Sequence, residues 1–280
     1  MLVDRLSVRV RHRSFEDADD GRFARSVCDT ALVPKDAGDI PGGYRAPEYW
    51  SERLTGIFNL RGTGHIEYSE AYNRWLYRAK ARALRAGLSG TTSGMAALDV
   101  GSGTGWVVAQ LRQRGLRVDG CDITDVAVDR LREAYPDLRF FRLRLGTDRV
   151  PVDDATYDVV TAMDVMYHIT DDMEWSAGLA DLTRVLRPGG RLVVSDRFGA
   201  DDVVPAEHVR FRSLERWREA AGACGLTLDH VRPMFRWLSL DRAATPLARL
   251  PDGLHGASAY VLDYVSRREP HLCCAVWQRT

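Results

Sequence analysis

The sequence LDVGSGTG at residues 98–105 places three alternating glycines directly after a short apolar run. Because glycine has no Cβ, such a loop lets the backbone come very close to a bound ligand. When a strand precedes the loop and a helix follows it, the N-terminus of that helix faces the ligand. Asp122 lies 21 residues after Gly101, near the end of a second strand-like run over residues 118–123. An acid in that place is suited to bind the hydroxyls of a ribose, so the pattern predicts a site for a nucleoside-containing cofactor.

The spacing of these glycines argues against a dinucleotide. Dinucleotide sites read G-x-G-x-x-G and bind a pyrophosphate at the helix N-terminus, whereas this chain reads G-x-G-x-G. Asp99 stands just before the loop. Its negative charge would repel a pyrophosphate and would suit a cofactor with a cationic amino-acid end. A nicotinamide-dependent oxidoreductase is therefore disfavoured.

Four segments, in order along the chain, resemble the motifs of the class I S-adenosylmethionine (SAM) methyltransferases. Residues 98–106 resemble the glycine loop, residues 120–123 the ribose-binding acid, residues 157–164 the fourth strand, and residues 184–194 the helix, Pro-Gly-Gly turn and fifth strand. The resemblance covers residues 96–198 most firmly. It implies SAM as the methyl donor and S-adenosylhomocysteine (SAH) as the product. It also implies an α/β fold with a doubly wound, seven-stranded, mostly parallel, Rossmann-like sheet and an N-terminal helical cap.

Strand and helix patterns alternate through the central part of the chain, which predicts a parallel sheet with helices on both faces. We expect three parts: an N-terminal arm over residues 1–40, an aromatic-rich helical cap over residues 41–90, and a SAM-binding domain over residues 91–280. An insertion at residues 239–270, with a helical stretch over residues 256–268, separates the last two predicted strands.

The aromatic residues before the first strand are a second candidate part of the site. Many small-molecule methyltransferases that resemble this chain close the cofactor crevice with N-terminal helices. This resemblance implies that Tyr72, at the start of a helix predicted over residues 73–86, contacts the cofactor. Tyr49, Trp50 and Trp75 would offer aromatic faces to a sulfonium or to an apolar substrate. The alternative is that these aromatic residues belong to the core.

Ligands in such sheets bind beyond the carboxyl ends of the strands, and the resemblance places the cofactor contacts there. Asp99 is expected to hold the amino-acid end or to order the amides of its own loop. Ile123 is expected against the adenine or in the core. Gly146 and Thr147 follow the third strand, where the family contacts the adenine amino group, but this segment departs from the commoner Gly-Asp pattern. The predicted cofactor-binding set is Asp99, Gly101, Ser102, Gly103, Gly105, Asp122, Ile123, Gly146, Thr147, Met163 and Tyr72.

Three residues are candidates for catalysis: His168, Tyr167 and His65. His168 follows the fourth strand, where the resemblance implies a histidine beside the transferred methyl group. A histidine can accept a proton from a hydroxyl or an amine near neutral pH, and the alternative is a structural histidine that caps the following helix. Tyr167 would face the same space. His65 lies in a glycine-rich loop, from which it would reach the substrate or remain on the surface.

Composition narrows the classes of partner. The net charge is zero, so there is no basic excess of the kind that nucleic-acid-binding proteins carry, and no polybasic tail for a membrane. No apolar run approaches the length of a membrane span, and the N-terminus is too charged for a signal peptide, so we expect a cytoplasmic protein. Asp164 and Asp196 would end neighbouring strands, but a third carboxylate for Mg²⁺ is not evident, so no metal is expected.

The resulting expectation is an enzyme that moves a methyl group from SAM to an oxygen, nitrogen or carbon atom of a small molecule by in-line displacement. A bacterial secondary metabolite is the predicted kind of substrate. Two alternatives remain open: a methyltransferase that acts on protein or RNA, and a non-catalytic SAM-binding subunit. The chain has no Asn-Pro-Pro-Tyr run for the amino groups of bases and no Pro-Cys nucleophile for cytosine. The acceptor and the oligomeric state are not predicted.

Overall fold

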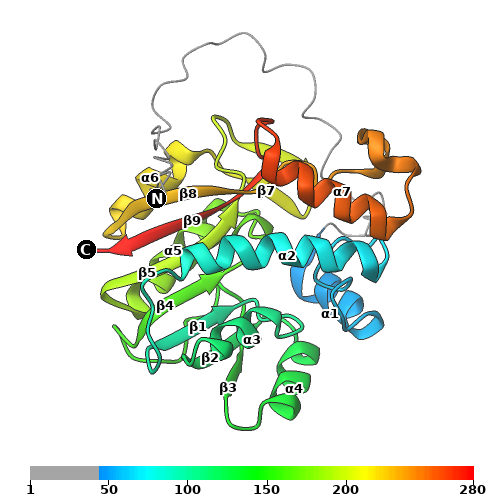
Figure 1. Cartoon of the computed structure of the whole chain (residues 1–280). Helices are drawn as coiled ribbons and strands as arrows, with labels where there is room; N and C mark the ends of the chain where they lie inside the picture. Colours follow the sequence, from blue (N-terminus) through cyan, green and yellow to red (C-terminus); the bar gives the residue numbers. More distant parts are fainter. Residues whose placement is uncertain (1–43) are drawn as a thin grey trace, which may run out of the picture.

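The computed structural model describes residues 44–280, so the predicted arm at residues 1–40 lies outside the described residues. A seven-stranded sheet forms the centre of the described part, in the order β3-β2-β1-β4-β5-β9-β8 (Figure 1). Only β9 runs antiparallel to its neighbours within this sheet. This arrangement confirms the predicted Rossmann-like fold class. The strands are β1 (Ala96–Val100), β2 (Arg117–Asp122), β3 (Arg139–Arg142), β4 (Tyr157–Ala162), β5 (Leu186–Asp196), β8 (Leu226–Phe235) and β9 (Leu272–Arg279).

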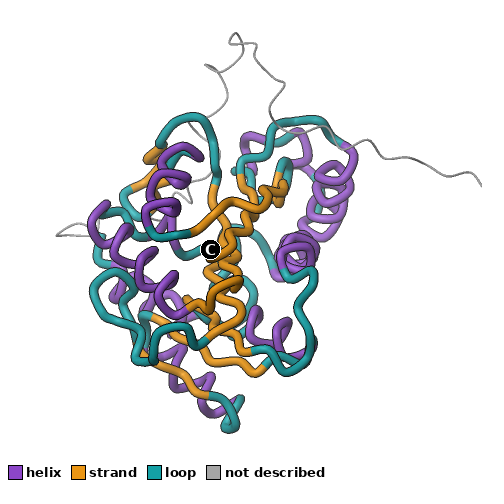
Figure 2. The backbone as a smooth tube through the Cα atoms, turned by 90° about the vertical axis from the view of Figure 1, so that its left-hand side faces the viewer, coloured by secondary structure: helices purple, strands orange, loops and turns teal. Residues whose placement is uncertain are grey.

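Helices cover both faces of the sheet, which Figure 2 shows nearly edge-on. Alternate residues of a strand point to opposite faces, so Val159 of β4 lies in the apolar cluster on one face and Val160 in the cluster on the other. A sheet that is buried on both faces needs such continuous apolar strands. One face carries α2 (Glu70–Gly87), α3 (Trp106–Gln113) and α4 (Asp125–Ala134), and the other carries α5 (Asp172–Val185) and α6 (Leu214–Ala223).

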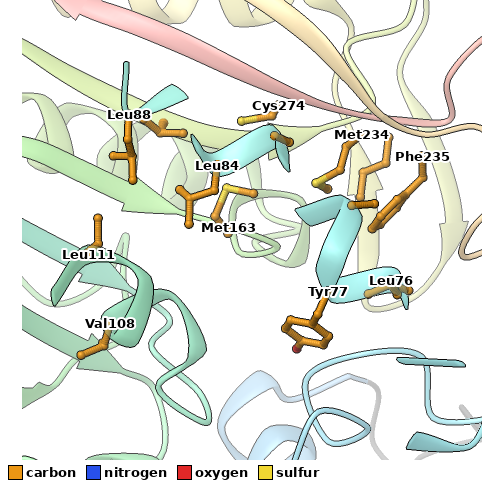
Figure 3. Packing of buried hydrophobic residues seen from close by; sticks show 14 of the residues in the cluster. Leu76, Tyr77, Leu84, Leu88, Val108, Leu111, Met163, Met234, Phe235 and Cys274 are labelled. Atoms are coloured by element: carbon orange, nitrogen blue, oxygen red, sulfur yellow. The ribbon is translucent and has the colours of Figure 1, made fainter. Parts of the chain in front are cut away.

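The helix predicted at residues 73–86 is present as α2, extended slightly at both ends, and it lies along the sheet. Its inner side buries Leu84 and Leu88 close to the buried sulfur-containing side chains of Met163 and Cys274 (Figure 3). Gly87 ends the helix, and a Cβ at this position would stand 2.8 Å from a methyl of Val193 on β5. The close approach of α2 to the sheet therefore depends on that glycine.

The insertion before the last strand holds two short 3₁₀ turns, η2 (Arg242–Ala244) and η3 (Pro246–Arg249), and the helix α7 (Asp252–Val265). The helical prediction was right in kind but began four residues too late. Figure 1 shows α7 beside α2. Within residues 44–280, no helix has the length and apolar character that crossing a membrane requires.

Three elements whose bounds the sequence did not predict lie toward the carboxyl ends of the parallel strands. They are the helix α1 (Ala46–Gly56), the 3₁₀ turn η1 (Met166–His168), and a separate hairpin made of β6 (Val203–Ala206) and β7 (Val209–Phe211). The first, α1, falls within the helical cap expected over residues 41–90. In Figure 1, α1 is drawn below the N-terminal half of α2. The sequence signal for α1 was weak because only Leu54 of this helix is fully buried.

Candidate functional site

A cavity of about 260 Å³ lies at the carboxyl ends of β1, β2 and β4. Its walls come from the glycine loop, the strand ends, α1, α2, η1 and the β6–β7 hairpin. This is the crevice where doubly wound sheets bind ligands. Nine of the predicted site residues line it: His65, Gly101, Ser102, Gly103, Asp122, Ile123, Met163, Tyr167 and His168.

The glycine loop follows β1 in a backbone conformation that favours glycine. Gly101 and Gly103 have φ angles of +69° and +50°, in the region that side-chain-bearing residues rarely adopt. A Cβ on Gly101 would overlap the side chain of Val165, and one on Gly103 would stand 2.7 Å from the methyl of Thr63. The loop is thus packed between neighbouring segments, with its backbone exposed to the cavity.

Asp122 ties the glycine loop to the end of β2. One carboxylate oxygen accepts a hydrogen bond from the Gly103 amide at 2.8 Å. The other accepts from the amide and the hydroxyl of Thr124, at 2.9 and 2.8 Å. Burial raises the pKa of Asp122, and these hydrogen bonds act against that rise. A carboxylate has about four lone-pair positions, so Asp122 retains capacity to accept from a ligand hydroxyl in the cavity.

Asp99 lies beneath the loop and does not line the cavity. Its Oδ1 accepts a hydrogen bond from the Thr161 hydroxyl at 2.7 Å, and the Ser102 hydroxyl donates to its backbone carbonyl at 3.0 Å. Its Oδ2 is buried with no hydrogen-bond partner among the described residues. Burial raises the pKa of Asp99 to about 7. Of the two roles expected for Asp99, this position agrees better with ordering the loop.

Four further predicted cofactor residues lie outside the cavity lining. A Cβ on Gly105 would stand 2.6 Å from Leu131, and a Cβ on Gly146 would overlap the α5 backbone, so both glycines serve close packing. Thr147 is exposed in the turn after β3. Tyr72 stacks on Tyr68 with 3.8 Å between ring centroids, and its hydroxyl accepts a hydrogen bond from the Ser239 amide. These four residues are Tyr72, Gly105, Gly146 and Thr147.

A buried ion pair between Lys80 and Asp164 stands in the wall of the cavity. Lys80 belongs to α2, while Asp164 follows β4 with a φ of +60° and exchanges hydrogen bonds of 2.7 and 2.8 Å with Ser195. Burial by itself would lower the pKa of Lys80, but the Asp164 carboxylate raises it overall. In the same way, burial favours the neutral form of Asp164 while Lys80 lowers its pKa overall. Both groups are therefore charged.

Sequence reasoning missed Lys80, although a signal for it was present. Lys80 is one of two lysines in the chain. It lies on the apolar side of α2, four residues after Leu76 and four before Leu84, both of which are buried. A lysine on the buried face of a helix requires a partner. The helical spacing of Lys80 with these two leucines therefore indicates a buried, paired cation.

His168 lines the cavity from the 3₁₀ turn η1. Its Nδ1 is 2.7 Å from the backbone carbonyl oxygen of His208, in the turn between β6 and β7. The ring of Trp50 on α1 packs edge-on against it, with centroids 5.0 Å apart. Burial lowers the pKa of His168 to about 4. No sequence signal predicted the contact with His208, which lies 40 residues further along the chain.

The other two catalytic candidates also line the cavity. His65 packs edge-on against Tyr68, its Nδ1 is buried with no hydrogen-bond partner among residues 44–280, and burial lowers its pKa to about 4. The pKa of Tyr167 lies well above its ordinary value, because burial and the Asp164 carboxylate both oppose its ionisation. Tyr167 therefore keeps its proton and acts as a donor.

The segment at residues 57–69 joins α1 to α2 and covers the glycine loop. The Arg53 guanidinium donates to the carbonyls of Gly62 and Gly64, each at 2.7 Å. The Thr63 hydroxyl lies 2.7 Å from the Tyr77 hydroxyl and 3.3 Å from that of Thr104. Tyr49 and Trp50 of α1 line the cavity, whereas Trp75 packs against Tyr260 outside it.

The two acids considered for a metal have other partners. Asp164 is paired with Lys80. Asp196 accepts a hydrogen bond from the Trp217 indole at 3.0 Å. Among the residues that the structure describes, no group of three or more metal-ligating side chains is present.

Comparison with known proteins agrees with this geometry. Residues 98–194 match the family described as a methyltransferase domain. The chain is 35% identical over 107 residues to the demethylmenaquinone methyltransferase of Beutenbergia cavernae, covering 38% of this chain and 42% of that protein. It is 36% identical over 149 residues to the methyltransferase GfsG of Streptomyces halstedii, covering 50% and 49%. The chain thus spans about half the length of the curated relatives it matches.

A solved structure extends the comparison to most of the chain. The 1,6-didemethyltoxoflavin-N1-methyltransferase of Burkholderia thailandensis superposes with a TM-score of 0.51 over 89% of this chain and 95% of its own, at 16% identity. Such a likeness concerns the fold. Residues 98–194 thus match a methyltransferase domain, and the fold of most of the described chain is like that of a solved methyltransferase.

Proposed function

We propose that the chain is a SAM-dependent methyltransferase that acts on a small molecule. The observation that carries this proposal is the glycine loop held against Asp122 at the carboxyl edge of the sheet, in a segment that matches the methyltransferase domain. Asp122 would accept hydrogen bonds from the ribose hydroxyls, and Ile123 would lie against the adenine, because both line the cavity beyond β2.

The residues present fit the amino-acid end of SAM as well. That end carries one ammonium and one carboxylate, and Lys80 and Asp164 supply one charge of each sign in the cavity wall. The backbone of Gly101 and Gly103 lines the same cavity, so a ligand can approach it closely. Charge complementarity in a site that excludes water is worth more than the same contacts in solvent. When bound, SAM supplies an electrophilic methyl group on its sulfonium, which an acceptor atom attacks in line.

The protein's own contribution to such a reaction is alignment, exclusion of water and removal of a proton. Met163 and Val165 flank the cavity at the end of β4 and would limit how an acceptor approaches. His168 is neutral at physiological pH because of its lowered pKa. It would accept the proton that the acceptor loses. Tyr167, which keeps its proton, and His65 would bind polar atoms of the substrate.

A small molecule fits the site better than a macromolecule. The cavity lies between α1, the segment at residues 57–69 and the β6–β7 hairpin, with apolar rings for walls. Relatives named for demethylmenaquinone and the structural neighbour solved with didemethyltoxoflavin and SAH act on or bind small molecules by their names. That the substrate is a secondary metabolite, and that the protein works in the cytoplasm, remain predictions.

Two measurements test the proposal. Isothermal titration with SAH should give saturable binding, and Asp122→Ala should weaken it. Transfer from methyl-labelled SAM into fractionated extract of the source organism should then label the low-mass fraction. Label found solely in protein or nucleic acid would contradict the small-molecule proposal. Binding of SAH without transfer to any fraction would support the alternative of a non-catalytic SAM-binding subunit.

A further inference from the structure

One part of the cavity wall is rich in rings. They come from three elements that are distant in the sequence: the start of the described chain with α1, the turn η1, and the β6–β7 hairpin. None of these rings is needed to hold the parts of SAM assigned above. The ring-bearing residues are Tyr44, Tyr49, Trp50, Tyr167, His168, His208 and Phe211.

The rings of Tyr49, His208 and His168 form a stack, and the Trp50 indole packs edge-on against two of them. The imidazoles of His168 and His208 are nearly parallel, at 9° with centroids 5.8 Å apart. Tyr49 stacks on the other side of His208 at 5.2 Å and 28°. Trp50 meets both Tyr49 and His168 edge-on, at 87° and 77°. Flat faces and ring edges together favour a flat aromatic ligand, because offset-stacked and edge-to-face contacts are the preferred ring geometries.

The charges around this part of the cavity disfavour a cationic acceptor. Arg53 is the charged side chain of α1 that lines it, and its guanidinium already donates to backbone carbonyls and to the Tyr49 hydroxyl. The acid facing this space, Asp164, is paired with Lys80. A protonated amine bound among these rings would therefore meet the Arg53 guanidinium and an acid that is already paired. A hydroxyl that becomes an anion during the reaction suits these surroundings better.

The contact between His168 and the hairpin fixes which ring nitrogen is basic. A backbone carbonyl can only accept, so Nδ1 of His168 carries the proton that is donated to the His208 oxygen. In the neutral imidazole, Nε2 is then the unprotonated nitrogen. No residue within 44–280 donates a hydrogen bond to Nε2. Nε2 is thus available to a ligand in the cavity that the ring lines.

We propose that this ring-lined part of the cavity is the acceptor subsite, that it takes an uncharged planar aromatic compound bearing a hydroxyl group, and that His208 is a positioning residue that holds His168 in its active tautomer. The inference rests on the proposed methyltransferase function and names its substrate class. In the reaction, the hydroxyl proton passes to Nε2 of His168 while an oxygen lone pair forms the bond to the methyl carbon. The carbon–sulfur bond breaks with its electron pair on sulfur, and the imidazolium later releases its proton to water.

Binding decides the substrate class. The SAH-loaded protein should bind hydroxycoumarin, a fluorescent planar phenol, and should not bind cyclohexanol. Trp50→Ala should weaken hydroxycoumarin binding about tenfold, by analogy with the loss of one aromatic contact. Trp75→Ala is the matched control, since Trp75 is equally half-buried but packs outside the cavity, and it should leave binding unchanged. Failure of any planar phenol to bind, while SAH binds, overturns the acceptor class alone; failure of SAH to bind overturns the proposed function itself.

Measurements of turnover test whether His168 accepts the hydroxyl proton. Methylation rates should be measured with planar phenols of increasing acidity, from naphthol through hydroxycoumarin to nitrophenol. The wild-type rate should depend weakly on acidity, whereas His168→Gln should lose naphthol methylation by about a hundredfold and retain methylation of the already ionised nitrophenol. An equal loss for every phenol, no loss at all, or binding without methylation of any hydroxyl would each overturn this part of the proposal.

The pH profile tests the positioning role of His208. The charged groups facing His168 are Arg53 from α1, Asp164 after β4 and the His208 ring from the hairpin. Burial keeps the pKa of His168 low, at about 4, and the His208 ring lies parallel to it with centroids 5.8 Å apart. His208→Ala retains the carbonyl but exposes His168, so the acid limb of kcat/KM should move upward toward the ordinary histidine pKa, together with a raised KM. A uniform loss of activity with an unmoved limb would mean that His208 is merely structural.

Discussion

The parts of the cavity that we assign to the cofactor (the glycine loop and Asp122, the cofactor end) and to the acceptor (the rings of α1, η1 and the β6–β7 hairpin, the acceptor end) are built differently. At the cofactor end, the glycine loop and Asp122 are close in sequence to the strands that carry them. Backbone groups make most of the contacts there. At the acceptor end, side-chain rings from α1, η1 and the β6–β7 hairpin meet across long stretches of chain. The first end is suited to recognise a constant cofactor, and the second can change its rings without disturbing the sheet.

The two ends also differ in how much sequence change they tolerate. A loop whose glycines are packed against Thr63 and Val165 tolerates little change. By contrast, the hairpin is separate from the main sheet, and α1 buries only Leu54 fully. Elements outside the main sheet are freer to vary with function, although Val209 and Phe211 of the hairpin are buried in the core.

The largest effect is expected from Gly103→Val. The new side chain would collide with Thr63 and would have to adopt a φ of +50°, so SAH binding should be abolished in isothermal titration. Gly189→Val is the matched control, because Gly189 also has a positive φ of +76° but has open space around its Cβ position. Normal SAH affinity in the Gly103 variant would remove the glycine loop from the cofactor end.

The ion pair between Lys80 and Asp164 is the next test. Lys80→Met leaves Asp164 buried and unpaired, which should lower the free energy of unfolding by about 3 kcal/mol in urea denaturation. Lys80→Met combined with Asp164→Asn should recover part of that loss, and asparagine tolerates the φ of +60° at position 164. Arg74→Met, which breaks an exposed pair on the same helix, should cost less than about 1 kcal/mol. Equal effects from Lys80 and Arg74 would contradict a buried, charged pair.

Asp122→Ala tests the cofactor end directly. It removes the acceptor for the Gly103 amide and the proposed ribose ligand, so the Kd for SAH should rise by about ten- to a hundredfold. Asp125→Ala serves as control, since Asp125 begins α4 close by but points to solvent in an exposed pair with Arg142. If both variants bind SAH as the wild type does, the ribose assignment is wrong.

Thr63→Val tests whether the segment that covers the glycine loop affects cofactor binding. The isosteric change removes the hydroxyl that contacts Tyr77 and Thr104, and we expect a loss of about 1 kcal/mol in SAH affinity with little loss of stability. Thr91→Val removes a comparable hydroxyl hydrogen bond, to the Leu88 carbonyl, away from the cavity. A Thr63 variant that differs in no way from the Thr91 variant would show that the covering segment does not act on the cofactor.

The smallest effect concerns pH just below neutrality. Burial lowers the pKa of His168 and His65 to about 4 and that of His271 to about 3. Below the unfolded histidine pKa of about 6.5, the unfolded chain takes up protons that the folded chain refuses, so these groups lower stability as pH falls. Asp99 and Asp196 act in the opposite sense, because burial raises each pKa to about 7.

Comparison of variants isolates the histidine contribution. His271→Phe lies outside the cavity lining and removes one titrating group. The urea midpoint should therefore fall less steeply between neutral and mildly acidic pH in this variant than in the wild type. Parallel curves for the two proteins would mean that His271 titrates alike in the folded and unfolded chains.

The fold and the cofactor end were largely predictable from sequence. The glycine spacing and Asp122 predicted a crevice at the strand ends, and nine predicted residues line a cavity there; their role in binding stays a prediction. The prediction for Tyr72 failed to place it there, because the Tyr68 and Tyr72 rings stack with each other under α7. Gly146 follows its strand as expected but packs on α5. In both cases the local secondary structure was predicted correctly, but the sequence did not show which segment the residue packs against.

Structural features that depend on neighbouring residues alone could be predicted from the amino-acid sequence. A positive φ at Gly101 and Gly103, apolar strands buried on both faces, and an acid at the end of β2 are all properties of short contiguous segments. Tertiary structure alone decided that Lys80 meets Asp164 and that His168 meets the carbonyl of His208. The physical reason is that such contacts depend on how helices and hairpins are placed against the sheet, and no local periodicity specifies that placement.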